Sequence, residues 1–296
     1  MKKVVVAGSG VLGSQIAFQT AFHNHQVVVY DIKDEFLEKA KEKMLLFFDV
    51  YKKDIGATQG QLDTAITNLS YSSNLEEAVQ DADIVIEAIP ENVQIKKDFY
   101  IKLGKVAPEK TIFCTNSSSF IPSQFAEDTG RPEKFLALHF LIEVWKHNVG
   151  EIMGHAGTNP EVFNEIIEFT TSIGLNPLPI YKEQPGYISN SILIPWASAA
   201  LKLWADGVTD FQTIDKFWMT GTQSNFTPFA FLDAVGMTTT YHIITAASKQ
   251  LNDSMLEKAA NRLQEEFIDK GKLGMATGEG FYSYPNPAFL DESFLM

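Results

Sequence analysis

Over the first two thirds of the chain, short apolar runs alternate with longer segments in which apolar residues recur at helical spacing. The runs are rich in β-branched residues and have the length of strands. They are residues 3–7, 26–30, 83–89, 111–115, 135–140, 151–153 and 177–181. The predicted helices between them are residues 11–22, 34–53, 92–103 and 161–172. Because strands that are apolar on both faces and separated by helices are typical of a parallel sheet covered on both sides, we predict an α/β fold.

The pattern changes after Tyr181. Residues 182–186 read Lys-Glu-Gln-Pro-Gly, a short polar segment that interrupts helices and strands alike. Every later segment with a clear period is helical. These predicted helices are residues 187–206, 210–219, 228–235, 238–251 and 254–270. Since the chain is also longer than one hydrophobic core usually serves, we predict two domains, residues 1–184 with the sheet and residues 185–296 made of helices.

The composition is that of a soluble globular protein and excludes several classes. The 296 residues are 45% hydrophobic and 21% charged, which argues against disorder, collagen-like repeats and coiled coils. The 24 basic and 37 acidic residues give a formal net charge of -13, which repels nucleic acid and anionic membranes. One cysteine, Cys114, cannot form an internal disulfide and points to the reducing cytoplasm. The apolar stretches are too short to cross a bilayer, so we expect no membrane partner. Because of the negative net charge we also expect no nucleic-acid partner.

A glycine-rich turn follows the first predicted strand and opens the first predicted helix. It reads Gly8-Ser9-Gly10-Val11-Leu12-Gly13, and in this context G-x-G-x-x-G is a dinucleotide-binding motif. The first glycine permits the tight turn, the second lets the backbone approach a pyrophosphate, and the third allows close packing of helix on strand. Eighteen residues after Gly13, Asp31 follows the second strand, where a carboxylate binds the ribose hydroxyls and repels a 2′-phosphate. The sequence therefore predicts a Rossmann-like, doubly wound sheet that binds NAD.

His139 lies at the end of the run 135–140, at the edge where an α/β sheet presents its ligand-binding groups. Histidine titrates near neutrality and can take the hydroxyl proton when an alcohol is oxidised, then return it on reduction. Glu151, twelve residues on, begins the next run, and its carboxylate can fix the tautomer of the imidazole. A histidine in this place can also be a buried core residue. The histidines show no metal-ligand spacing with Cys, Asp or Glu, and we predict no metal.

Four further segments, taken with the glycine-rich turn, resemble a known enzyme family. They are residues 81–92 (DADIVIEAIPEN), 115–119 (TNSSS), 184–190 (QPGYISN) and 278–282 (GEGFY). Their order resembles that of the 3-hydroxyacyl-CoA dehydrogenases, most closely the bacterial 3-hydroxybutyryl-CoA dehydrogenases. The resemblance implies a Rossmann-like NAD-binding domain followed by a helical domain that forms a homodimer. It also implies an NAD-dependent oxidoreductase that interconverts an L-3-hydroxyacyl-CoA, of short chain, and the 3-ketoacyl-CoA.

The resemblance also implies roles for single residues. The family's catalytic histidine and its orienting glutamate match His139 and Glu151. The donors that polarise the substrate oxygen match Ser118 and Asn190, and donors of this kind stabilise a developing alkoxide. The further positions that contact NAD in the family match Ala88, Glu91, Lys96 and Ser118.

Simpler explanations exist for four of these residues. Ser118 can be a loop or helix-cap serine, and Asn190 can be a buried structural amide in a helix. Glu91 and Lys96 can be solvated surface charges. The sequence leaves these alternatives open.

One departure from the family pattern lies close to the predicted catalytic histidine. Ile142 stands three residues after His139, where the family usually has an asparagine. Losing such a buried hydrogen-bonding partner costs about 1–3 kcal/mol unless another side chain replaces it. The polar side chains of the same loop that can do so are Trp145, His147 and Asn148.

Three more departures concern charge and coenzyme A. Ala276 stands where the family often has a lysine, and Ser191 where it usually has an arginine. The family holds CoA with a serine and a lysine in the second helix, and here the register gives Phe47 and about Lys53 or Asp54. The lysines of that helix either offset CoA phosphates or form its solvated face. The departures leave two rivals, a dehydrogenase of a small non-thioester 3-hydroxy acid such as carnitine or gulonate, and an NAD-binding protein without turnover.

Overall fold

The computed structural model describes residues 1–295. The chain divides into two compact units, the first of them Met1–Ile188 and the second beginning at Ser189. The first unit is built on a β-sheet and the second on helices. Within residues 1–295, none of the helices combines the length and the apolar character that crossing a membrane requires.

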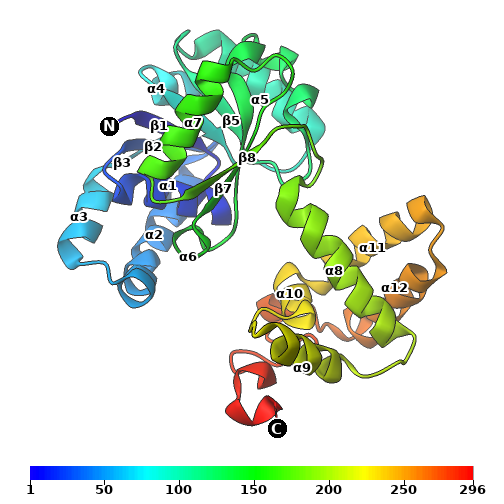
Figure 1. The fold of residues 1–296 in the computed structure, drawn as a ribbon. Coiled ribbons are helices and arrows are strands. Elements are labelled where there is room, and N and C mark those ends of the chain that lie inside the picture. Colours follow the sequence, from blue (N-terminus) through cyan, green and yellow to red (C-terminus); the bar gives the residue numbers. More distant parts are fainter. Residues whose placement is uncertain (296) are drawn as a thin grey trace. The chain divides into compact units, whose positions relative to one another are not determined.

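The first unit contains an eight-stranded sheet in the order β3-β2-β1-β4-β5-β6-β7-β8 (Figure 1). The bounds are β1 Lys3–Ala7, β2 Gln26–Tyr30, β3 Leu69–Ser72, β4 Ile84–Glu87, β5 Ile112–Thr115, β6 Phe135–Phe140, β7 Val149–Met153 and β8 Asn176–Ile180. The first six strands are parallel, whereas β7 runs antiparallel to β6 and β8 runs parallel to β7. The sheet is thus mostly parallel and departs from the prediction at β7 and β8. The connection from β6 to β7 spans only residues 141–148, and a parallel crossover needs about a dozen residues or more.

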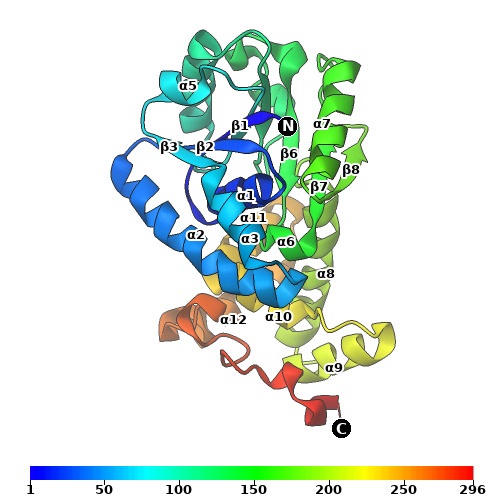
Figure 2. The same cartoon turned by 90° about the vertical axis from the view of Figure 1, so that its left-hand side faces the viewer.

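Helices cover both faces of this sheet. Their bounds are α1 Val11–Phe22, α2 Asp34–Ile55, α3 Gln59–Thr67, α4 Leu75–Val79, α5 Val93–Val106, α6 Val144–His147 and α7 Pro160–Ser172. Alternate residues of β1 face opposite ways, so Val4 and Val6 join one core with α1, while Val5 and Ala7 join another with α5. Figure 2 shows β1 and β6 between α5 on one side and α7 on the other. The prediction of a Rossmann-like sheet covered on both faces is therefore confirmed.

The strands with the strongest apolar pattern lie where the sequence predicts them. Strands β1, β2 and β6 and helix α1 have the predicted bounds. Strand β3 is not among the predicted strands, because it reads Leu-Ser-Tyr-Ser and none of its side chains is fully buried. The short helices α3, α4 and α6 are not among the predicted helices either, because they have too few turns for a clear period.

Five helices make up most of the second unit, which confirms the prediction of a helical C-terminal domain. Their bounds are α8 Tyr187–Ala205, α9 Phe211–Thr222, α10 Pro228–Val235, α11 Met237–Leu251 and α12 Ser254–Glu266. The first two residues of α8 still belong to the first unit. One hydrophobic core joins them to the C-terminal turn around Phe281 and Tyr282. Buried Asp233 fixes this turn by accepting the backbone N–H groups of Phe281 and Tyr282, each at 2.8 Å.

Candidate active site

The glycine-rich turn has a backbone that only glycine permits at two positions. Gly8 has a φ of +105°, and a Cβ there would lie 2.4 Å from the carbonyl oxygen of Ala88. A Cβ on Gly13 would lie 1.9 Å from the carbonyl oxygen of Gly8, so α1 packs directly on the turn. Gly10 has nothing within 4 Å of the corresponding position and precedes α1 without a side-chain cap. The N–H groups that begin α1 therefore suit an anionic ligand such as a pyrophosphate.

A cavity of about 770 Å³ lies beside this turn. Five predicted cofactor residues line it, namely Gly8, Ser9, Gly10, Asp31 and Ala88. Asp31 Oδ2 accepts hydrogen bonds from Ser9, at 2.8 Å from the backbone N–H and 2.6 Å from the hydroxyl. The glycines, the open start of α1 and this carboxylate together fit a bound dinucleotide. The other predicted cofactor residues are not part of the cavity lining: Val11, Leu12, Gly13, Glu91, Lys96 and Ser118.

His139 and Glu151 stand directly opposite each other on the antiparallel strands β6 and β7. The imidazole Nδ1 and the Glu151 Oε2 are 2.8 Å apart, and the two residues are only 6% and 1% exposed. Glu151 Oε1 accepts the backbone N–H of Ile188 at 2.9 Å. The ring of Tyr187, whose pKa is raised by burial and by nearby carboxylates, packs on the imidazole with centroids 4.8 Å apart. Because Nδ1 is held by the carboxylate, Nε2 is the nitrogen that can exchange a proton with a ligand.

Ser118 is exposed in the segment that follows β5, residues 116–120, which we call the serine loop. The side-chain oxygen of Asn116 accepts the backbone N–H of Phe140 at 2.9 Å. This bond joins the serine loop to the strand end at which His139 lies. The predicted site residue Asn190 belongs to α8 and to the second unit.

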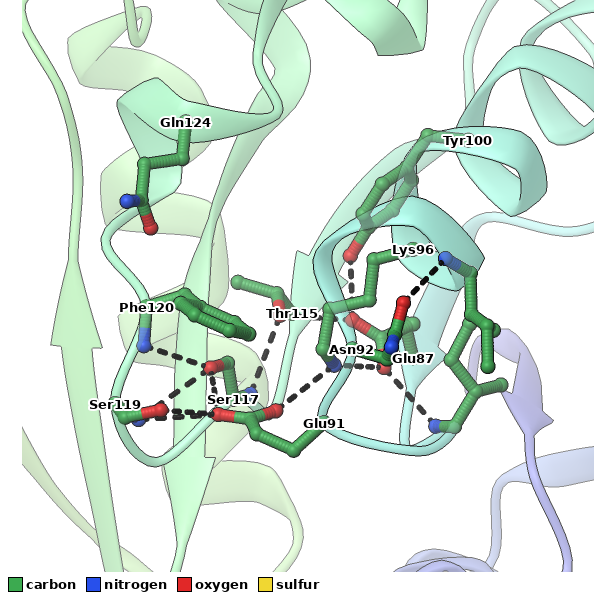
Figure 3. Close-up of polar contacts among 12 residues, drawn as sticks. Glu87, Glu91, Asn92, Lys96, Tyr100, Thr115, Ser117, Ser119, Phe120 and Gln124 are labelled. Atoms are coloured by element: carbon green, nitrogen blue, oxygen red, sulfur yellow. Dashed lines mark hydrogen bonds and ion pairs between the residues drawn. The ribbon is translucent and has the colours of Figure 1, made fainter.

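A polar network lies beside the serine loop (Figure 3). Glu91 Oε1 accepts hydrogen bonds from the hydroxyls of Ser117 and Ser119, the latter at 2.8 Å. Burial opposes ionisation of Glu91, but the Ser117 hydroxyl and the Lys96 ammonium outweigh it and hold the pKa of this carboxyl below its ordinary value. Lys96 is 1% exposed and forms ion pairs with Glu87 at 2.6 Å and Glu91 at 3.2 Å. The alternative of a solvated surface charge is therefore wrong for Lys96.

Glu87 is a residue of this network that is not among the predicted site residues. This residue ends β4 after three apolar residues and is fully buried. Lys96 and Tyr100, four residues apart on α5, both donate hydrogen bonds to its carboxylate. A carboxylate at the end of an apolar strand, followed by two donors at helical spacing, was the signal available in the sequence.

Three of the positions that depart from the family pattern lie on α2 or in the loop after β6. Phe47 on α2 is buried and packs against Phe18 with ring centroids 5.5 Å apart. Asp54 on α2 accepts the indole N–H of Trp145 at 2.9 Å. Ile142 is 57% exposed. Since the single N–H of the indole is bound to Asp54, Trp145 does not replace the hydrogen bond that an asparagine would make at position 142.

Known proteins resemble this chain over nearly its whole length. The model of the 3-hydroxyacyl-CoA dehydrogenase NAD binding domain matches residues 3–184, and that of the C-terminal domain matches residues 186–284. Human mitochondrial hydroxyacyl-coenzyme A dehydrogenase is 30% identical over 289 residues, which cover 96% of this chain and 91% of the human one. A probable 3-hydroxybutyryl-CoA dehydrogenase of Deinococcus radiodurans is 30% identical over 288 residues, 95% of this chain and 100% of its own.

Among solved structures, a diketoreductase that acts on dicarbonyl compounds is similar with a TM-score of 0.89 and 48% sequence identity. The similarity covers 96% of this chain and 99% of the diketoreductase. The two family domains match in the order in which the two units follow each other, and the first is an NAD-binding domain. The chain therefore belongs to the family of NAD-dependent 3-hydroxyacyl-CoA dehydrogenases.

Proposed function

We propose that this enzyme oxidises an L-3-hydroxyacyl compound to its 3-keto form and catalyses the reverse reduction, with His139 as general acid/base and Glu151 as the group that orients it. The observation that supports this most is the 2.8 Å contact between His139 Nδ1 and Glu151 Oε2 in a buried cross-strand pair. The glycine-rich turn and Asp31 would hold NAD, which would supply the hydride acceptor for the oxidation and, in its reduced form NADH, the hydride donor for the reduction.

The proton follows a separate route from the hydride. In the oxidation, His139 Nε2 takes the proton of the 3-hydroxyl group, and in the reduction it returns that proton to the oxygen. Glu151 stabilises the resulting imidazolium through Nδ1–H, which is worth more in a buried site than in water. Ser118 and Asn190 donate hydrogen bonds to the same substrate oxygen and stabilise the charge that develops on it. Gly8, Ser9, Gly10, Asp31 and Ala88, which line the cavity, would hold the cofactor.

The substrate class that we propose first is a short-chain 3-hydroxyacyl-CoA. Two relatives at 30% identity support it, since they are named for hydroxyacyl-coenzyme A and for 3-hydroxybutyryl-CoA. The lysines that α2 offers, Lys39 and Lys43 among them, can offset the phosphates of CoA.

A CoA-free 1,3-dicarbonyl compound is the second candidate. The diketoreductase shares 48% identity with this chain, more than the relatives named for acyl-CoA. Where the family holds CoA with a serine and a lysine, this chain has Phe47, which is buried, and about Lys53 or Asp54, of which Asp54 binds Trp145. Phe47 cannot donate a hydrogen bond to a phosphate, and the carboxylate of Asp54 repels one. The reacting centre, a ketone two carbons from a second carbonyl group, is the same in both candidates.

The test is a comparison of acetoacetyl-CoA with free 3-keto esters and 1,3-diketones, each reduced with NADH by wild-type protein and by His139→Gln. We expect wild-type turnover of at least one class, and loss of turnover in the variant by about 10²-fold or more. Titration of NADH fluorescence should give the same affinity for both proteins, because His139 does not line the cofactor cavity. An undiminished rate in His139→Gln would refute the catalytic assignment, and saturation by only one class decides between the candidates.

We also propose that the enzyme is a cytoplasmic homodimer that associates through its second unit. Large apolar side chains are exposed there, including Ile192 at 60%, Val208 at 64% and Phe217 at 73%. A contiguous apolar surface is typical of an interface between subunits, and these side chains are the ones that would contribute to it. Light scattering after size-exclusion chromatography should give about twice the 33.0 kDa mass of the chain, and a monomer at micromolar concentration would contradict the proposal.

A further inference from the structure

The carboxylate of Glu87 is fully buried at the end of β4 and accepts four hydrogen bonds. Oε1 accepts them from Lys96 Nζ at 2.6 Å and from the backbone N–H of Ile89 at 2.9 Å. Oε2 accepts them from the hydroxyls of Tyr100 and Thr115, each at 2.8 Å. The donors come from α5, from β5 and from the loop after β4, so a single side chain joins three segments (Figure 3).

The ammonium group of Lys96 continues this network towards the surface. Its Nζ lies 2.6 Å from Glu87 and 3.2 Å from Glu91, whose side chain is 37% exposed. Because Lys96 is 1% exposed, water contributes little to solvating its charge, and the two carboxylates determine where the ammonium lies. Glu87 thereby fixes the position of Lys96, and Lys96 fixes that of Glu91.

Two connections run from this network to the serine loop. Glu91 Oε1 accepts the hydroxyl of Ser119 at 2.8 Å and that of Ser117, and these two serines flank Ser118. The second connection runs through Thr115, whose hydroxyl donates to Glu87 and accepts the backbone N–H of Ser117 at 3.2 Å. Ser117 Oγ itself accepts a hydrogen bond from a backbone N–H of the loop, that of Phe120, at 2.9 Å. The first connection thus contacts the residues on both sides of Ser118, and the second holds the backbone before it.

We propose that Glu87 is a positioning residue for the reaction, one that acts through Lys96, Glu91 and Thr115 to hold the serine loop so that Ser118 meets the substrate oxygen. The inference rests on the proposed function, in which Ser118 donates a hydrogen bond to that oxygen. A buried ion pair is weak as a source of stability, since apolar side chains of similar volume often stabilise a core as well. What a charged, fully bonded network provides instead is one defined geometry, and this network lies at the ends of β4 and β5, next to the serine loop.

Glu87→Gln tests the proposal while keeping the volume of the side chain. Glutamine has one acceptor oxygen where glutamate has two, so some of the four donors lose their acceptor. The charge at position 87 is also lost, and Glu91 becomes the remaining carboxylate that pairs with Lys96. We expect kcat for the preferred 3-keto substrate to fall by about tenfold or more, because a displacement of about 1 Å at a reacting group can cost 10²-fold. The NADH dissociation constant should change by less than about threefold, since Glu87 does not line the cofactor cavity.

The matched control is Thr111→Val. Thr111 directly precedes β5 and thus lies at the end of this strand opposite to the serine loop. It is fully buried and donates a hydrogen bond to the carbonyl of Ala82 at 2.7 Å. Its replacement removes a buried hydrogen bond from the other end of the same strand and should lower the melting temperature while leaving kcat within about twofold. A kcat in Glu87→Gln that is as high as in this control would overturn the proposal.

Ser117→Ala provides a second, less disruptive variant, because it shortens one small side chain in the connection itself. It should lower kcat in the same direction as Glu87→Gln, and the double variant should be no slower than the slower single variant, since the connection through Glu91 that Ser117→Ala interrupts is one of the two that Glu87 supports. Single effects that multiply, or an unchanged kcat in Ser117→Ala, would contradict the proposal.

Amide hydrogen exchange separates this proposal from the proposed function. Exchange of residues 117–120 should be faster in Glu87→Gln than in wild type and Thr111→Val, whether or not a substrate is turned over. If wild-type protein reduces no 3-keto compound, the proposed function fails and the exchange data still decide on the network. Equal exchange rates in the three proteins would exclude the positioning role.

Discussion

Glu151→Gln replaces one oxygen of a buried side chain and removes its charge. In the structure, Oε2 faces His139 Nδ1 at 2.8 Å and Oε1 accepts the N–H of Ile188 at 2.9 Å. Glutamine offers only one oxygen for these two donors. If the oxygen stays on Ile188, the amide NH₂ faces Nδ1, and the imidazole then carries its proton on Nε2 and cannot act as a base. If it turns to His139 instead, the N–H of Ile188 is left unpaired, which costs about 1–3 kcal/mol.

The first arrangement avoids the unpaired backbone group, so we expect the wrong tautomer to predominate. General acid–base catalysis contributes about 10²–10⁴-fold to a rate, and kcat should fall by that factor, equivalent to about 3–5 kcal/mol of transition-state stabilisation. The assay follows NADH absorbance during reduction of the preferred 3-keto substrate between pH 5 and pH 9, and NADH affinity is measured by fluorescence.

Ile152→Val is the control for Glu151→Gln, because Ile152 is a buried neighbour on the same strand that points to the opposite face. Removing one methylene there should cost about 1 kcal/mol of stability and leave kcat nearly unchanged. A kcat in Glu151→Gln within about tenfold of the wild-type value, with unchanged pH dependence, would show that the carboxylate does not set the state of His139.

Three further perturbations have expected outcomes. Gly13→Ala should abolish NADH binding measured by fluorescence, because its Cβ would lie 1.9 Å from the carbonyl oxygen of Gly8 and α1 would have to move. Asp31→Asn should lower the ratio of kcat/KM for NADH to that for NADPH by about tenfold or more, since the charge that repels a 2′-phosphate is lost. Burial raises the pKa of Asp233 from 3.8 to about 6, so the folded protein binds this proton more tightly than the unfolded chain. Its contribution to stability is therefore highest below about pH 4, falls by about 3 kcal/mol as the pH rises to about 6, and is constant above that. Calorimetric melting temperatures should decline over this range, and less so in Asp233→Asn.

Local patterns were sufficient to predict the parts of the fold whose signal lies within a few adjacent residues. Val4, Val5 and Val6 are buried on alternating faces, so the apolar run in the sequence has a direct counterpart in the sheet. The glycine-rich turn was predictable for the same reason, because Gly8 and Gly13 mark the positions where neighbouring backbone comes too close for a Cβ.

The parts that could not be predicted depend on partners that are distant in the sequence. Strand β3 is half exposed at the edge of the sheet and is held by pairing with β2 rather than by its own side chains. Glu87 meets Thr115, 28 residues away, only because β4 and β5 pair in the register that sets these two residues side by side. No periodic pattern in one sequence contains that register.

The position of Glu151 depends on the direction of β7, which its own residues do not determine. His139 lies near the end of β6. If β7 were parallel to β6, Glu151, which comes soon after the start of β7, would lie towards the opposite edge of the sheet, where the parallel strands begin. The connection between the two strands, residues 141–148, is too short for a parallel crossover, so β7 reverses and sets Glu151 across from His139. The N–H of Glu143, in that connection, donates to Gln15 Oε1 at 2.8 Å, which ties the connection to α1, the helix that begins at the glycine-rich turn. The length of one loop therefore brings together the proposed acid–base pair and holds it in a fixed relation to the dinucleotide site.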